Sequence, residues 1–185
     1  MRIARQVSAR KHWNRARGFT LVELAVAMSI LLIGIASVVS ATSRMNALRK
    51  YNRERGLGQN ALRSMAERIH AAAYRFSEDP ATWSQELLGA YGPGGTPGNT
   101  FPVLGLNVSP TQTTQGEVSF VSDETTTDAD LGLELGMPRD LNGDGDALDA
   151  DVTASARILP VILDLRWTGQ NGESRLAHGF YVMGY

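Results

Sequence analysis

Oxygen-bearing side chains recur at alternate positions in the segment 140–151, DLNGDGDALDAD. Four of them occupy its first, third, fifth and twelfth positions: Asp140, Asn142, Asp144 and Asp151. Alternate residues of a tight loop can turn their oxygens toward one centre, and Gly145 at the sixth position permits the sharp turn that this needs. Oxygen atoms are the ligands that Ca²⁺ takes in proteins. The sequence therefore predicts a calcium site.

The same segment resembles the calcium loop of EF-hand and dockerin modules. The resemblance implies that the backbone carbonyl of Asp146 is a further ligand, and that water serves at the ninth position, where Leu148 has no ligating group. Two departures are that Asp151 is shorter than the glutamate of EF-hands and that no clear helix precedes the loop. The alternative is a solvated acidic loop, because residues 123–151 hold ten acidic side chains and a single base, Arg139. So many acids repel one another without a cation, which favours calcium as a structural cofactor.

A lone carboxylate, Glu23, lies in the otherwise uncharged run of residues 19–41. A helix of this length spans about 35 Å, enough to cross a hydrocarbon layer of about 30 Å. A charge inside such a helix costs about 2.5 kcal/mol or more, so Glu23 needs a partner. The alternative is a position at the membrane surface, where the side chain reaches water.

All the charge of residues 1–18 is positive and comes from six residues: Arg2, Arg5, Arg10, Lys11, Arg15 and Arg17. The positive-inside rule places this end in the cytoplasm, which predicts a single-pass protein of the inner membrane with its C-terminus outside. An ordinary secretory signal fits poorly, because its apolar stretch is only about 7–15 residues long.

The junction RGFTLVEL, residues 17–24, resembles the prepilin leader of type IV pilins and pseudopilins. The resemblance covers about residues 14–50. It implies that prepilin peptidase cuts between Gly18 and Phe19 and N-methylates Phe19, whose new ammonium pairs with Glu23 of the same or a neighbouring subunit. It also implies other pilin or pseudopilin subunits and an inner-membrane assembly platform as partners, and a pilus or pseudopilus as the final location.

Apolar residues continue at helical spacing beyond the membrane segment, which predicts an amphipathic helix over residues 42–76 packed on a head of residues 77–185. Gly56 and Gly58 weaken this helix by about 1 kcal/mol each. The two glycines mark either a point where the helix bends or unfolds within a filament or a locally flexible segment with no such role.

A second, short helix is expected after residue 79. Asp79 is its expected N-cap, Pro80 its first residue and Gly89 its stop. Residues 89–102 contain five glycines and three prolines, which predicts a loop.

Strand-like runs at residues 103–108 and 117–122 precede the acidic loop, which we define as residues 123–156. A C-terminal hairpin is expected over residues 157–183, since an Asn-Gly pair separates two β-type runs. Pro160 indicates an edge position or a strand start. The fold class is therefore α+β: a long N-terminal helix, with a transmembrane and an amphipathic half, packed on a small antiparallel sheet, as the pilin resemblance also implies.

Composition narrows the function. Without the six basic residues of the leader, 12 basic and 19 acidic side chains remain, a formal charge of −7 that makes nucleic-acid binding unlikely. The chain has no cysteine, its three histidines are scattered, and no enzyme motif stands out. The expected role is non-enzymatic: a structural subunit of a type IV pilus or type II secretion pseudopilus, first of all a minor one at the initiating or tip position. The alternatives are a tip adhesin and an anchored periplasmic calcium-binding protein that never polymerises.

Overall fold

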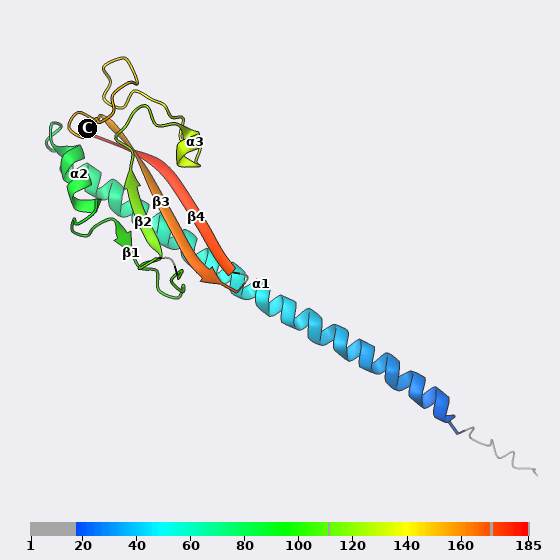
Figure 1. Cartoon of the computed structure of the whole chain (residues 1–185). Coiled ribbons are helices and arrows are strands. Elements are labelled where there is room, and N and C mark those ends of the chain that lie inside the picture. Colours follow the sequence, from blue (N-terminus) through cyan, green and yellow to red (C-terminus); the bar gives the residue numbers. More distant parts are fainter. Residues whose placement is uncertain (1–17, 111, 171, 185) are drawn as a thin grey trace, which may run out of the picture. The chain divides into compact units, whose positions relative to one another are not determined.

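The computed structural model describes residues 18–110, 112–170 and 172–184 (Figure 1). The basic leader charges predicted to face the cytoplasm lie outside the described residues. The chain divides into two compact units, Met1–Met45 and Asn46–Tyr185. Helix α1, Leu21–Phe76, contributes to both. The remaining elements are α2 (Trp83–Tyr91), β1 (Thr100–Phe101), β2 (Gly116–Phe120), α3 (Asp128–Leu131), β3 (Ile158–Gly169) and β4 (Gly172–Met183).

The first unit consists, where described, of the apolar half of α1. Among the described residues α1 is the one helix long and apolar enough to cross a membrane, and none of its most apolar stretch is buried in the protein. This distinguishes it from the core helix of a soluble domain. Ser29 and Ser37 donate their hydroxyl hydrogens to the carbonyls of Ala25 and Ile33, four residues back, so these polar groups are satisfied within the helix.

The second unit, the head, contains a four-stranded antiparallel sheet in the order β1-β2-β3-β4. Its largest part is the hairpin of β3 and β4, paired from Ile158↔Met183 to Gly169↔Gly172. Strand β2 pairs with the other side of β3 and ends at Phe120↔Val161. Pro160 lies near the start of β3, one residue beyond this last pair, where its carbonyl still accepts from Val121 N–H (3.0 Å) and its missing N–H falls at the very end of the β2 ladder. A long N-terminal helix with a small antiparallel sheet confirms the predicted α+β, pilin-like architecture.

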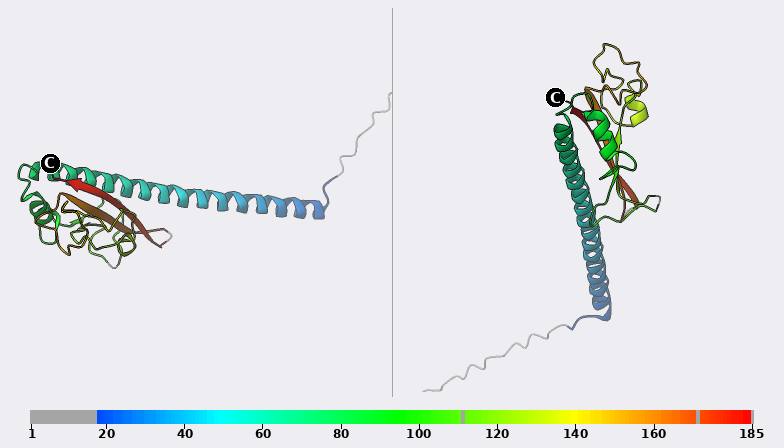
Figure 2. Two further views of the ribbon diagram at one scale, coloured as in Figure 1. Left: turned by 90° about the horizontal axis from the view of Figure 1, so that it is seen from above. Right: turned by 90° about the vertical axis from the view of Figure 1, so that its left-hand side faces the viewer.

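The core of the head lies between α1 and one face of the sheet (Figure 2). Buried α1 residues recur every three or four positions: Leu62, Met65, Ala66, Ile69, Ala72 and Ala73. Alternate β3 residues meet them from the sheet: Leu159, Val161, Leu163, Leu165 and Trp167. The periods of helix and strand thus bring one apolar stripe onto one apolar face.

Gly58 has a packing role that the sequence did not reveal. Helix α1 runs through both Gly56 and Gly58 without interruption. A Cβ at Gly58 would lie 2.9 Å from Leu165 Cδ2 and 3.1 Å from Leu176 Cδ1, whereas a Cβ at Gly56 would meet nothing within 4 Å. Gly58 therefore lets the hairpin approach the helix closely.

The predicted bounds of the second helix were wrong. Helix α2 begins at Trp83 and ends at Tyr91, so Gly89 lies inside it and Pro80 precedes it. Asp79 Oδ1 accepts a hydrogen bond from Ala81 N–H, and Asp79 O accepts from Trp83 N–H, so Asp79 organises the turn before the helix. Contacts with distant residues set the helix position, because Trp83 Nε1–H donates to Ala156 O (2.9 Å).

The strand predicted at residues 103–108 is also wrong. That segment is irregular, and the adjacent strand is instead β1, within the predicted loop of residues 89–102. The buried side chain of Gln115 accepts from Val103 N–H (3.0 Å) and donates to Leu106 O (2.8 Å). A side chain therefore satisfies backbone groups that a sheet ladder would otherwise pair.

Candidate functional site

The predicted processing junction lies directly before α1. Gly18, Phe19 and Thr20 have no regular secondary structure and are exposed, with Phe19 retaining 88% of its accessible surface. A Cβ built at Gly18 would meet nothing within 4 Å. Within the described residues, the Gly18–Phe19 bond is thus outside the helix and uncovered, as a protease needs.

Glu23 forms a reciprocal cap with Thr20 at the start of α1. Glu23 Oε2 accepts from Thr20 N–H (2.9 Å) and Thr20 Oγ1–H (2.8 Å), and Glu23 N–H donates to Thr20 Oγ1 (3.3 Å). The Thr-x-x-Glu spacing is the sequence signature of a capping box, which accounts for this contact. The ammonium of Phe19, which the prepilin resemblance implies as the partner of Glu23, exists only after cleavage, so that pairing stays a prediction.

The first half of the predicted calcium loop is a tight coil held by its own side chains. Asp140 Oδ2 accepts from Gly145 N–H (3.0 Å), five residues on. Asn142 Oδ1 accepts from Asp144 N–H (2.9 Å), and Asp144 Oδ1 accepts from Asp146 N–H (3.1 Å). These bonds wind the backbone around the alternating side chains.

The last predicted ligand, Asp151, is engaged elsewhere. Its Oδ1 accepts from the N–H and the hydroxyl of Thr153, and the hydroxyl bond is the larger cause that lowers the pKa of Asp151. Among the described residues, no three histidine, aspartate or glutamate side chains converge as a metal site would require. The first half of the loop has the expected winding, and Asp151, the last predicted ligand, is hydrogen-bonded to Thr153.

Glu124, which no sequence pattern distinguishes from the other acids of the loop, is completely buried. Glu124 Oε1 accepts from Leu141 N–H (2.6 Å) and Asn142 N–H (3.1 Å), and Glu124 N–H donates to Asp149 O (3.0 Å). Its Oε2 is buried and has no hydrogen-bond partner in the described part of the chain. This carboxylate therefore holds the start of the coil by hydrogen bonds to its backbone, although it lies 17 residues before Leu141 in the sequence.

Asp128 organises the other half of the acidic loop. Its carboxylate accepts from the N–H groups of Leu135 (3.0 Å), Gly136 (2.9 Å) and Met137 (3.0 Å). Hydrogen bonds to the ionised form, the one from Met137 foremost, lower the pKa of Asp128. At the start of helix α3 (Asp128–Leu131), Asp130 and the N-cap residue Thr127 form a capping box, and the hydrogen bonds from Thr127 lower the pKa of Asp130.

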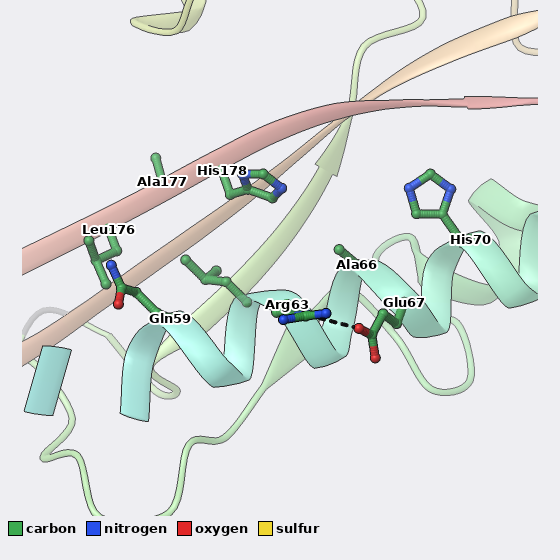
Figure 3. A pocket seen from close by; sticks show the side chains of 9 residues that line it. Gln59, Arg63, Ala66, Glu67, His70, Leu176, Ala177 and His178 are labelled. Carbon is green, nitrogen blue, oxygen red and sulfur yellow. Dashed lines mark hydrogen bonds and ion pairs between the residues drawn. The ribbon is translucent and has the colours of Figure 1, made fainter. Parts of the chain in front are cut away.

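A groove of about 520 Å³ runs between α1 and β4 (Figure 3). Leu62, Ala66, Leu176 and Ala177 contribute its apolar lining, and an ion pair of Arg63 with Glu67 (3.0 Å) lies on the helix side. His70 and His178 also line it, and both rings lie beside Phe180, at 4.8 and 5.6 Å between centroids. Two histidines that are scattered in the sequence thus line one groove, while His12 lies outside the described residues.

The comparisons with known proteins concern the N-terminal region. A family model described as the prokaryotic N-terminal methylation motif matches residues 13–39. No curated protein and no solved structure matches the chain. The match includes the processing junction and most of the apolar half of α1, and it supports a pilin-like or pseudopilin-like protein. Proteins with this motif are substrates of prepilin peptidase and assemble with other pilins.

Proposed function

We propose that the chain is a structural subunit of a type IV pilus or a type II secretion pseudopilus. The observation that supports this most is the methylation motif at residues 13–39, which includes an exposed junction and is followed by an apolar helix that no described residue covers. Uncovered apolar surface needs either lipid or the helices of neighbouring subunits. Cleavage after Gly18 leaves that helix in the product, which is what a filament subunit requires.

The proposed position is that of a minor subunit, initiating or at the tip. The acidic loop presents six exposed carboxylates: Asp130, Glu134, Asp144, Asp146, Asp149 and Asp151. Many such surfaces along a filament would repel one another, whereas in the few copies of a minor subunit each can be met by cations or by a basic surface of a neighbouring copy. A tip adhesin differs in its phenotype: loss of the head function would abolish attachment while filaments persist.

Mass spectrometry of the N-terminus tests the proposal, on both membrane and sheared-surface fractions. We expect an N-methylated Phe19 as the first residue. Replacement of Gly18 by a bulky leucine should leave the whole leader attached, while the matched change Gly34→Leu, in open space on α1, should be processed normally. An intact leader throughout, in cells with active prepilin peptidase, would overturn the proposal.

We also propose that the loop binds Ca²⁺ through Asp140, Asn142, Asp144 and the Asp146 carbonyl. The winding of the coil around its alternating donors supports this, as does the buried Oε2 of Glu124 near its base. Asp151 would have to release Thr153 to become a ligand. Bound calcium would link the acidic loop in a head that has no disulfide.

Thermal unfolding of the full chain with Ca²⁺ and with chelator tests the calcium proposal. Calcium at about a hundred times its dissociation constant should stabilise the head by about 2.7 kcal/mol. Asp144→Ala should remove this increment, and Glu134→Ala, an exposed acid outside the predicted ligands, should retain it. Equal unfolding temperatures in calcium and chelator for the unaltered chain would refute the site.

A further inference from the structure

Basic side chains surround α1 where it enters the head. Within two turns there are four exposed ones: Arg49, Lys50, Arg53 and Arg55. The acid among them, Glu54, is buried and lies 3.8 Å from Lys50 Nζ. None of the three arginines forms an ion pair within the described residues. We call residues 49–55 the basic collar.

The acidic loop has the complementary charge. Its six exposed carboxylates form no ion pair with a basic side chain in the part of the chain that the structure describes. The loop is attached beside α2, where Ser84 Oγ–H donates to Thr153 O (2.7 Å) and Trp83 Nε1–H donates to Ala156 O (2.9 Å). It therefore has a defined place in the head and is not a free tail.

The collar and the loop lie at opposite ends of the head (Figure 1). The hairpin end of the sheet is beside the collar, because a Cβ at Gly169 would lie 2.9 Å from Glu54 Oε2. The C-terminal part of the loop, at Thr153 and Ala156, is at the other end, next to α2, which follows the end of α1 at Phe76. From Arg53 to Phe76 the helix rises about 35 Å. The two patches are thus too far apart to neutralise each other within one head.

A second copy displaced along the helix axis by about that distance would bring its collar to the acidic loop of the first. Because collar and loop are different surfaces, the contact is head-to-tail and leaves a free collar and a free loop on the pair. Repeating contacts of this kind build open filaments, whereas self-complementary contacts close into dimers.

We propose that the basic collar docks onto the acidic loop of a second copy of this chain, which rests on the proposed filament function and names a partner surface for it. Anionic lipid headgroups would suit the collar, but they would leave the exposed carboxylates outside the proposed calcium ligands unmatched, such as Asp130, Glu134 and Asp149. A second copy matches both. Exposed charge pairs are individually weak and screened by salt, so the contact selects the partner and its register, while apolar surface supplies the bulk of the assembly energy.

Cross-linking in the full chain tests this contact, and the absence of native cysteines makes an introduced pair unambiguous. Arg53→Cys with Asp146→Cys should give covalent dimers and higher ladders on mild oxidation of membranes and sheared filaments. The matched pair, Arg53→Cys with Glu117→Cys, carries its second thiol at an exposed acid of β2 outside the loop and should stay monomeric, as should each single variant.

Charge exchange shows whether electrostatics drives the contact. Arg49→Glu added to the cross-linking pair should lower the dimer yield about threefold, and Asp149→Lys in the same chain should restore much of it. The yield should also fall as salt rises. A substitution that merely damages the head would not be rescued by an opposite charge in the loop.

The outcomes separate the two proposals. Processed protein in sheared filaments without the cross-link would overturn the docking contact and leave the filament role intact. Cross-linking without any filament would support the contact and overturn the role. If no cross-link forms and Arg49→Glu instead abolishes binding of the full chain to vesicles of anionic phospholipid, the collar faces lipid and the docking proposal is overturned.

Discussion

Replacing Glu124 by alanine tests how the acidic loop is fastened to the head. Glu124 Oε1 accepts two backbone N–H groups, those of Leu141 and Asn142, and Leu141 is completely buried. Each buried donor left without a partner costs about 1–3 kcal/mol. Removal of the carboxylate also removes its buried, unpartnered Oε2, and this gain offsets part of the cost. We therefore expect Glu124→Ala to lower the free energy of unfolding by about 2–3 kcal/mol.

Urea unfolding of the processed chain in detergent, in the presence of chelator, measures this difference. Fluorescence of Trp83 and Trp167, which are 1% and 2% exposed, reports the packing of the head. The same loss should lower the midpoint of thermal unfolding by about 6–10 °C for a unit of this size. Chelator separates the effect from any contribution of calcium.

Two variants serve as controls for Glu124. Glu124→Gln keeps an acceptor oxygen for the two N–H groups and should lose less than half as much stability as Glu124→Ala. Glu134→Ala removes an exposed acid of the same loop and should change stability by less than about 0.5 kcal/mol. If Glu124→Ala and Glu134→Ala are equally stable, Glu124 does not hold the loop and the reasoning fails.

Three further predictions concern the glycines of α1, acid stability and the cap at Glu23. Gly56→Ala should stabilise the helix by about 0.5–1 kcal/mol. Gly58→Ala should gain less or lose stability, because its Cβ meets Leu165 and Leu176. Equal urea midpoints for the two variants would refute this difference. The pKa of Asp128 is lower in the folded state, so its ionised carboxylate stabilises the head above the unfolded pKa, and this contribution is lost as pH falls through the folded pKa. Asp128→Asn should thus be less stable than the unaltered chain near neutral pH, and the difference in unfolding free energy should close in acid. A difference that does not change with pH would show that the charge of Asp128 is not its cause. Glu23→Gln should reduce filament incorporation while leaving cleavage intact, measured by comparing processed protein in membrane and sheared fractions; undiminished incorporation would show that the charge is not needed.

The sequence by itself determined the features that depend on neighbours along the chain. The apolar run, its single carboxylate and the helical spacing beyond it predicted α1 as one long helix, because a helix closes its hydrogen bonds within four residues. Two β-type runs separated by an Asn-Gly pair predicted the hairpin at the C-terminus for a similar reason, since each strand pairs with its nearest neighbour along the chain. The Thr20–Glu23 cap was equally readable from its spacing and was overlooked.

Tertiary structure decided the features that depend on distant partners. Trp83 and its bond to Ala156 position α2, and the side chain of Gln115 removes residues 103–106 from the sheet. Glu124 could be assigned to the loop only after the fold brought it under Leu141. Contacts between distant residues close long loops, and the packed core offsets the entropy that this costs. The pairing of buried polar groups therefore depends on the whole fold and is not encoded in a local sequence pattern.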